Sequence, residues 1–273
     1  MWGGGRPGGA TGGFCGGIPG DWPLAGGRYY KGSQMLKVDS KPATEVLAAL
    51  PVFPLPNVVL LPGMILPLNV FEPRYLQLVD FVRAHGQHIG VPLLRPTDEM
   101  TATGLPAFEQ VFGLGKLVAH ATLPDGRRLI RLEGLGRVQV QREQPQTHLF
   151  REVDAVALPE PYPDDREGVA ILKAQVERIS RYCGEDGASA LTSLLTLVDT
   201  RVLLYALTAF LPSLELLVHD PDAPIDREGL IVMQQRSLAA ESADLRVALL
   251  VERATAILGG LSERCGMPPE LLN

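Results

Sequence analysis

The chain has 273 residues, of which 46% are hydrophobic and only 6% aromatic, so it can build one or two compact domains with aliphatic cores. Its net charge of −6 and its lack of a long lysine and arginine run argue against general nucleic-acid binding. Four arginines, at positions 127, 128, 131 and 137, are interpreted as a solvated strand face, with a local basic patch as the alternative.

The cysteines and the apolar runs exclude several further classes of protein. Cys15, Cys183 and Cys265 lie far apart without a C-x-x-C pair, which argues against a disulfide framework and against a zinc site. The longest apolar run, residues 202–211, is far shorter than the ~20 residues of a membrane helix. The first residues also lack the pattern of a secretory signal. We therefore expect a soluble, cytoplasmic protein that does not bind membranes.

Residues 1–45 are dominated by glycine, with scattered proline and serine. Such a composition loses much backbone entropy on ordering and offers few side chains to bury, so this segment is predicted to be a disordered tail. Its aromatic residues are candidate contact points, and a leader without function is an equally good interpretation.

Regular structure is predicted to begin near Leu50, where short apolar runs alternate with five prolines up to residue 67. Proline in these positions excludes a helix and fits short strands at the edges of a barrel, where a missing N–H breaks no ladder bond. Pro73 then suits the first position of a helix, and apolar residues at helical spacing extend that helix over about 73–84.

The next part of the chain is rich in β-strand patterns. Residues 87–94 predict a strand, which is followed by a long polar excursion. Residues 109–141 predict a hairpin, because Asp125-Gly126 supplies the positive φ of a tight turn. Glycines inside both of its strands predict bulges or bends that close a small barrel, and they occupy positions 113, 115, 134 and 136. A further strand is expected over about 148–157.

Beyond residue 163 the hydrophobic period lengthens from two to about three and a half, which predicts amphipathic helices. Apolar residues recur at this spacing from Val169 to Cys183 and from Val247 to Leu261, and three more helices fit 188–197, 199–211 and 226–239. The expected fold class is therefore α+β. We predict a β-rich subdomain over 48–160, a helical subdomain over 163–262 and a short tail over 263–273.

We find no pattern that assembles a catalytic, metal or cofactor site. Residues 113–117, GLGKL, lack the spacing and the hydroxyl of a phosphate-binding loop. His85 and His88 have no third ligand at suitable spacing. Asp164 and Asp165 precede a helix, which favours capping over acid-base chemistry. Likewise, Cys183 continues an apolar stripe and is interpreted as core.

Two segments resemble the amino-terminal, substrate-binding domain of the Lon protease family. LPVFPLPNVVLLPGMILPLNVFEPRYLQLV, residues 50–79, is similar to the opening of that domain, and FGLGKLVAHATLPDGRRLIRLEGLGRVQV, residues 112–140, is similar to its glycine-containing hairpin. The resemblance extends over about 48–260. It implies a PUA-like β pseudo-barrel of about six strands followed by a helical bundle. In the full-length enzymes this domain helps to select unfolded or tagged protein substrates.

The chain departs from the full-length enzymes, because it has neither an ATP-binding motif nor a Ser-Lys dyad region. We therefore expect a non-catalytic module or adaptor, without cofactor, that binds unfolded or apolar polypeptide segments. The candidate contact residues are Leu61, Met64, Met100, Leu105 and Phe108, with core packing as the alternative for the first two. A small-molecule-binding regulatory domain is the competing function, which a pocket lined by aromatic side chains would favour.

Overall fold

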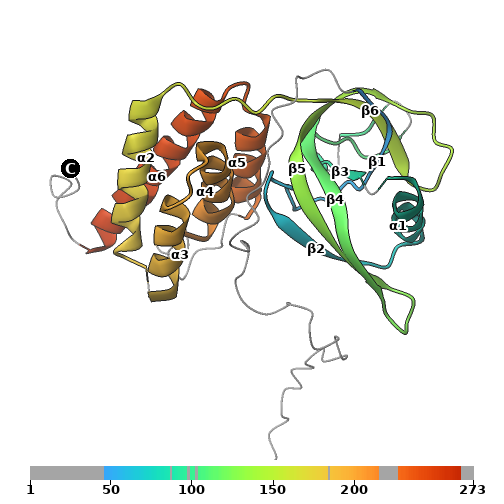
Figure 1. Ribbon diagram of the computed structural model, residues 1–273, viewed down its shortest axis with the longest axis horizontal. Helices are drawn as coiled ribbons and strands as arrows, with labels where there is room; N and C mark the ends of the chain where they lie inside the picture. Colours follow the sequence, from blue (N-terminus) through green and yellow to red (C-terminus); the bar gives the residue numbers. More distant parts are fainter. Residues whose placement is uncertain are drawn as a thin grey trace, which may run out of the picture.

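The computed structural model describes residues 46–86, 88–96, 99–101, 104–183, 185–214 and 227–265. The predicted disordered tail over 1–45, and residues 266–273 of the predicted short tail, lie outside the described residues. Strands dominate the first half of the described chain and helices the second, so the α+β class is confirmed (Figure 1). The amino-terminal half consists of β1 (Val46–Val52), β2 (Ile65–Val70), α1 (Pro73–His85), β3 (His88–Val91), β4 (Val111–Thr122), β5 (Arg128–Glu143) and β6 (Arg151–Ala157).

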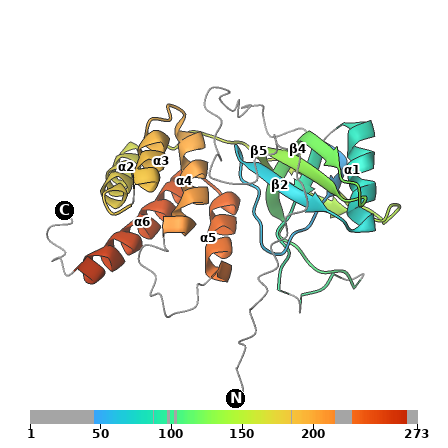
Figure 2. The ribbon, with the colours of Figure 1, turned by 90° about the horizontal axis from the view of Figure 1, so that it is seen from below.

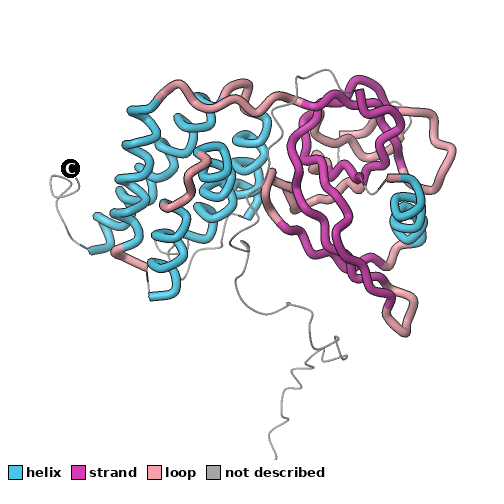
Figure 3. The backbone as a smooth tube through the Cα atoms, in the orientation of Figure 1, coloured by secondary structure: helices cyan, strands magenta, loops and turns pink. Residues whose placement is uncertain are grey.

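The strands close into a barrel because β5 is long enough to have two different partners on one side. The strand order is β2-β5-β4-β3-β1-β6, and β6 also pairs with β5. The first part of β5, from Arg128 to Glu133, pairs with β2, and its second part, from Val138 to Glu143, pairs with β6. Five strands thus form a closed ring with β2 attached at its margin, which confirms the predicted pseudo-barrel (Figure 3).

Two of the four strand glycines allow another segment to cross the sheet at close range. A Cβ atom on Gly113 would lie 2.0 Å from the carbonyl oxygen of Leu60, and one on Gly134 would lie 2.2 Å from that of Leu61. The predicted bend is also present, because the register of β4 and β5 shifts between Leu114 and Gly115. The glycines therefore serve both the bend and the passage of residues 60–61, and sequence reasoning anticipated only the bend.

Pro67 of the proline-rich opening behaves as its edge-strand interpretation predicts, whereas Pro51 lies in β1, which is no edge strand because it pairs with both β3 and β6. Gly134 donates its N–H to the Met64 carbonyl at 2.8 Å. In an antiparallel ladder the backbone N–H and C=O groups of successive residues point alternately toward and away from the partner strand. Counted from Met64, Pro67 directs its nitrogen to the open edge of β2 and breaks no bond to β5. Pro73 occupies the start of α1, and Leu78 and Val82 of this helix are buried against the barrel.

The carboxy-terminal half is a helical bundle that confirms the change of period. It consists of α2 (Arg166–Ser180), α3 (Glu185–Leu195), α4 (Thr200–Leu214), α5 (Arg227–Ala239) and α6 (Ala243–Cys265). Helices α2, α3, α4 and α6 share one aliphatic core, whereas α5 lies on the side that faces the barrel (Figures 1 and 2). None of the described helices is long and apolar enough to cross a membrane.

Candidate protein-binding surface

The five predicted contact residues fall into two places, and the first is the junction between barrel and helices. Leu61 is fully buried there, in one cluster with Tyr205 of α4 and Leu238 of α5. Met64 is half-buried and packs against the same cluster, as does Ile231 of α5. In this structure Leu61 is a core residue, which was the alternative interpretation. A binding role for this pair stays a prediction.

The second place is an arm, residues 94–108, that leaves the barrel between β3 and β4. Isolated bridges pair Leu94 with Phe108 and Met100 with Pro106, so the arm doubles back on itself. Met100 is 54% exposed and Leu105 is half-buried, whereas Phe108 packs into the barrel core. The arm thus presents one large apolar side chain to solvent, and Phe108 fixes its base.

Charged side chains hold the base of the arm against the barrel. Arg151 of β6 donates to the Pro106 carbonyl at 2.8 Å, and its guanidinium lies over the Phe108 ring at 4.3 Å. The Nε and Nη2 atoms of this guanidinium also donate to the two carboxylate oxygens of Glu143, at 2.6 and 2.8 Å. Planar contacts of this kind restrict the arginine to one orientation. The base of the arm, at Pro106 and Phe108, is therefore positioned before any partner binds.

A buried ionic network at the junction was not anticipated from the sequence. Arg137 of β5 donates to the Glu160 carboxylate at 2.8 Å and to the carbonyls of Leu238 and Ala240, at 2.9 and 2.6 Å, where α5 ends. Tyr205 donates to the other carboxylate oxygen at 2.7 Å. Burial raises the pKa of the Tyr205 hydroxyl, so this group stays a donor. The network therefore connects the barrel, the segment between β6 and α2 that contains Glu160, and two helices.

Arg246 of α6 completes this network. Its guanidinium stacks on the Tyr205 ring at 4.3 Å, and its Nε donates to the Ser237 carbonyl at 3.0 Å. Burial lowers the pKa of Arg246. The expected solvated face of arginines is thus wrong for Arg137, which is only 4% exposed. The partners of its side chain lie 22 or more residues away in the sequence, so no local pattern could have revealed them.

The residues that sequence reasoning rejected as sites have structural roles. Asp165 caps α2 by accepting from the Gly168 N–H at 2.8 Å, which confirms the capping interpretation. Cys183 packs against the helical core, and burial raises the pKa of its thiol. Within the described part of the chain, no group of three or more histidine, cysteine and acidic side chains is placed to hold a metal ion.

Comparison with known proteins identifies one family. The model of the ATP-dependent protease La (LON) substrate-binding domain matches residues 49–216. Among curated proteins, the Lon protease of Rhizobium meliloti is 31% identical over 144 residues, and that of Cytophaga hutchinsonii is 29% identical over 142 residues. These matches cover 52% and 50% of this chain but only 17% of either relative. The chain therefore spans less than a fifth of the length of the curated relatives it matches.

Two solved structures are also similar. A Lon N-terminal domain protein from Xanthomonas campestris has a TM-score of 0.40 and 28% identity, and the match covers 60% of this chain and 99% of that one. The N-terminal domain of the Mycobacterium avium complex Lon protease has a TM-score of 0.40 and 15% identity, with 78% and 98% covered.

Proposed function

The chain belongs to the family of the substrate-binding domain of ATP-dependent protease La (LON), and we propose that it is a non-catalytic module that binds unfolded or apolar segments of other polypeptides. The observation that carries this proposal is the family match over residues 49–216, which takes in nearly the whole barrel and the helices up to α4. Because the chain spans so little of its curated relatives, we do not assign their proteolytic activity to it. An adaptor that works in the cytoplasm is the role we infer.

The arm supports this proposal physically. Met100 is exposed on a positioned segment, and methionine is unbranched and polarizable, so it adapts to differently shaped apolar partners. An unfolded chain offers such partners, because its apolar side chains are not yet buried. Pre-positioning of the arm also reduces the entropy that binding would lose.

A small-molecule-binding domain is less well supported. Side chains of α5 and α6 line a hollow with a volume of about 230 Å³. Ligand pockets usually measure roughly 300–1,000 Å³. None of its lining residues is aromatic. These properties suit one or two aliphatic side chains of a polypeptide better than a compact organic ligand.

Fluorescence anisotropy tests the proposal. A labelled protein that is kept unfolded by reduction and carboxymethylation is titrated with the chain, in parallel with the same protein in its native, disulfide-bonded form. We expect saturable binding of the unfolded form alone. The variant Met100→Asp should weaken this binding by roughly tenfold, because burying Met is worth about 1.5–3 kcal/mol. Met100→Leu should bind like the wild type.

Val198→Asp is the control for placing an aspartate at an exposed apolar position, because Val198 is 89% exposed and lies between α3 and α4, away from the arm. It should bind the unfolded protein like the wild type. Equal binding of the folded and unfolded forms, or no binding of either, would refute the proposal. Circular dichroism of each variant shows whether the fold is retained.

A further inference from the structure

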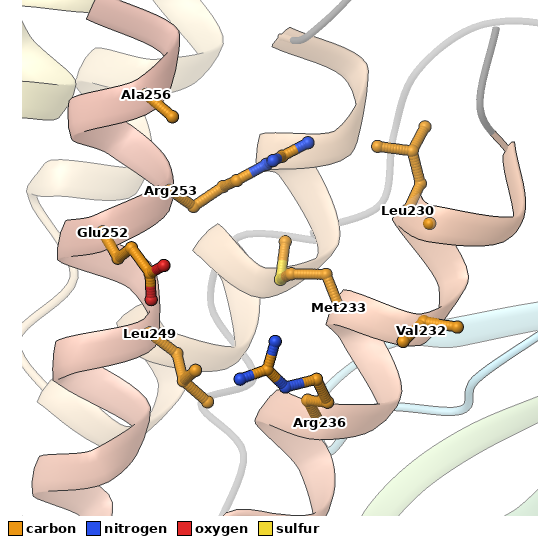
Figure 4. A pocket seen from close by; sticks show the side chains of 9 residues that line it. Leu230, Val232, Met233, Arg236, Leu249, Glu252, Arg253 and Ala256 are labelled. Atoms are coloured by element: carbon orange, nitrogen blue, oxygen red, sulfur yellow. The ribbon is translucent and has the colours of Figure 1, made fainter.

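Helices α5 and α6 are joined by residues 240–242 and diverge from there (Figure 2). Side chains of the two helices line the hollow of about 230 Å³, which we call the groove. Figure 4 shows Met233 of α5 and Leu249 of α6 directed into the space between the helices, with Ala256 farther along α6. The floor of the groove is therefore aliphatic.

The apolar character of the groove continues along α6. The face of this helix that packs into the bundle carries Val247, Leu250 and Ala254. A second apolar stripe, Leu245, Leu249 and Ala256, recurs at intervals of four and seven residues, which places its members on a different face. Leu245, at the end of this stripe nearest α5, is 45% exposed. A helix with two apolar faces and only one core to pack against has a face left for a partner.

The charges at the rim are of mixed sign but predominantly positive. Arg236 of α5 and Arg253 of α6 line the groove together with one acidic residue, Glu252 (Figure 4). The whole chain, by contrast, has a net charge of −6. Arg236 forms no ion pair with any residue that the structure describes. An additional carboxylate at the rim would therefore gain a charge-assisted hydrogen bond.

We propose that this groove binds a segment of the client polypeptide in which one or two aliphatic side chains enter the hollow and a neighbouring acidic side chain meets Arg236. This proposal rests on the proposed function and deepens it, because it defines the preferred client as apolar and acidic. The volume of the hollow limits its occupant to a few side chains, and the Arg236 guanidinium selects the sign of the flanking charge.

The test uses anisotropy with the full chain and two short labelled peptides. One consists of leucines and glutamates, and the other has lysine in place of every glutamate. We expect the wild type to bind the acidic peptide more tightly. Arg236→Glu should weaken that binding roughly fivefold and strengthen binding of the basic peptide, as surface ion pairs contribute up to about 1 kcal/mol. Arg181→Glu is the matched control, since Arg181 is exposed at the end of α2.

A second variant tests the hollow itself. Ala256→Glu places a longer, charged side chain at an exposed position in the groove and should weaken binding of the acidic peptide by roughly tenfold. Ala174→Glu makes the same change at an exposed position of α2, outside the groove, and should leave binding unchanged. Both alanines are exposed, so neither change removes a core contact.

The outcomes separate this proposal from the proposed function. If Arg236→Glu and Ala256→Glu bind both the peptides and the unfolded protein like the wild type, the groove is not the site, although the module still binds polypeptides. Equal affinity of the wild type for the two peptides overturns the charge preference. A change of sedimentation in the groove variants, without a change of peptide binding, identifies a self-association face and also overturns the proposal. If the wild type binds no polypeptide at all, the proposed function itself fails.

Discussion

Replacing Gly113 by alanine should strongly destabilise the protein, whereas the same change at Gly136 should not. The added Cβ atom at Gly113 would lie 2.0 Å from the Leu60 carbonyl oxygen, and Cβ atoms essentially never approach closer than 3.0 Å. The two strands or the crossing segment must therefore move apart by at least 1.0 Å. At Gly136 nothing lies within 4 Å of the added atom, although Gly136 is paired with Leu114, the neighbour of Gly113.

The size of the effect follows from what Leu60 and Leu61 contact. Leu60 belongs to the barrel core and Leu61 to the junction core, so a shift of this segment disturbs both clusters. Overpacking alone costs about 1–3 kcal/mol, and we expect the upper end of this range or more for Gly113→Ala. Gly136→Ala should change the free energy of unfolding by less than about 1 kcal/mol, and in the stabilising direction if its backbone suits alanine.

Urea unfolding followed by circular dichroism measures both variants against the wild type, because the midpoint falls with stability at constant slope. Gly134→Ala should resemble Gly113→Ala, as its added atom would lie 2.2 Å from the Leu61 carbonyl oxygen. If Gly113→Ala unfolded at the same urea concentration as Gly136→Ala, the close crossing of residues 60–61 would not exist in solution, and this explanation of the glycines would be refuted.

Three further predictions concern the junction and β1. Glu160→Gln should lower the free energy of unfolding by about 3–5 kcal/mol, because it leaves the buried Arg137 and Arg246 without a countercharge. In the same urea assay Glu143→Gln, at a half-exposed ion pair, should lower it by less than about 1 kcal/mol. Hydrogen bonds from the Ala49 N–H and then from the Gln144 and Arg142 side chains lower the pKa of Asp154 from 3.8 to about 2. The contribution of Asp154 to stability is therefore present above pH 3.8 and is lost as the pH falls toward 2. Asp154→Asn should flatten the acid limb of a stability-versus-pH curve, and an unchanged limb would contradict this. Ala49 has a positive φ of 49° where the register of β1 and β6 shifts, so Ala49→Gly should be more stable than Ala48→Gly by roughly 1–2 kcal/mol in thermal unfolding. The reverse order would disprove backbone strain at Ala49.

The elements that sequence reasoning predicted well are those that depend on near neighbours. The hairpin turn is one example: Gly126 has a φ of 86°, and Asp125 accepts from the Arg127 N–H at 3.1 Å. Helix α1 begins at Pro73, and the helices predicted after residue 163 correspond to α2–α6 within a few residues at their ends. Each of these patterns repeats within a few positions, so the local sequence contains the signal.

Features that connect distant parts of the chain were not predictable in the same way. Leu61 and Met100 are both apolar, yet one is fully buried and the other is 54% exposed, because tertiary packing decides which of them faces solvent. Barrel closure depends on β5 pairing with β6 as well as with β4, which no repeating pattern indicates. The groove does have a sequence signal, the second apolar stripe of α6 from Leu245 to Ala256, whose members are not among the five predicted contact residues. The division into separate subdomains at 48–160 and 163–262 stays a prediction.

The junction fixes the distance between the two proposed binding surfaces, the arm and the groove. Aliphatic contacts such as those around Leu61 tolerate sliding, but the bonds from Arg137 to the Leu238 and Ala240 carbonyls require one placement of α5 against β5. The groove begins at the same end of α5, so its position relative to the barrel and the arm is set by these bonds. If one unfolded chain contacts both the arm and the groove, the second contact becomes intramolecular and adds affinity without a new interface. Loss of the Glu160 countercharge should therefore weaken the binding of long unfolded chains more than that of short acidic peptides, because only the long chains depend on the distance between the two surfaces.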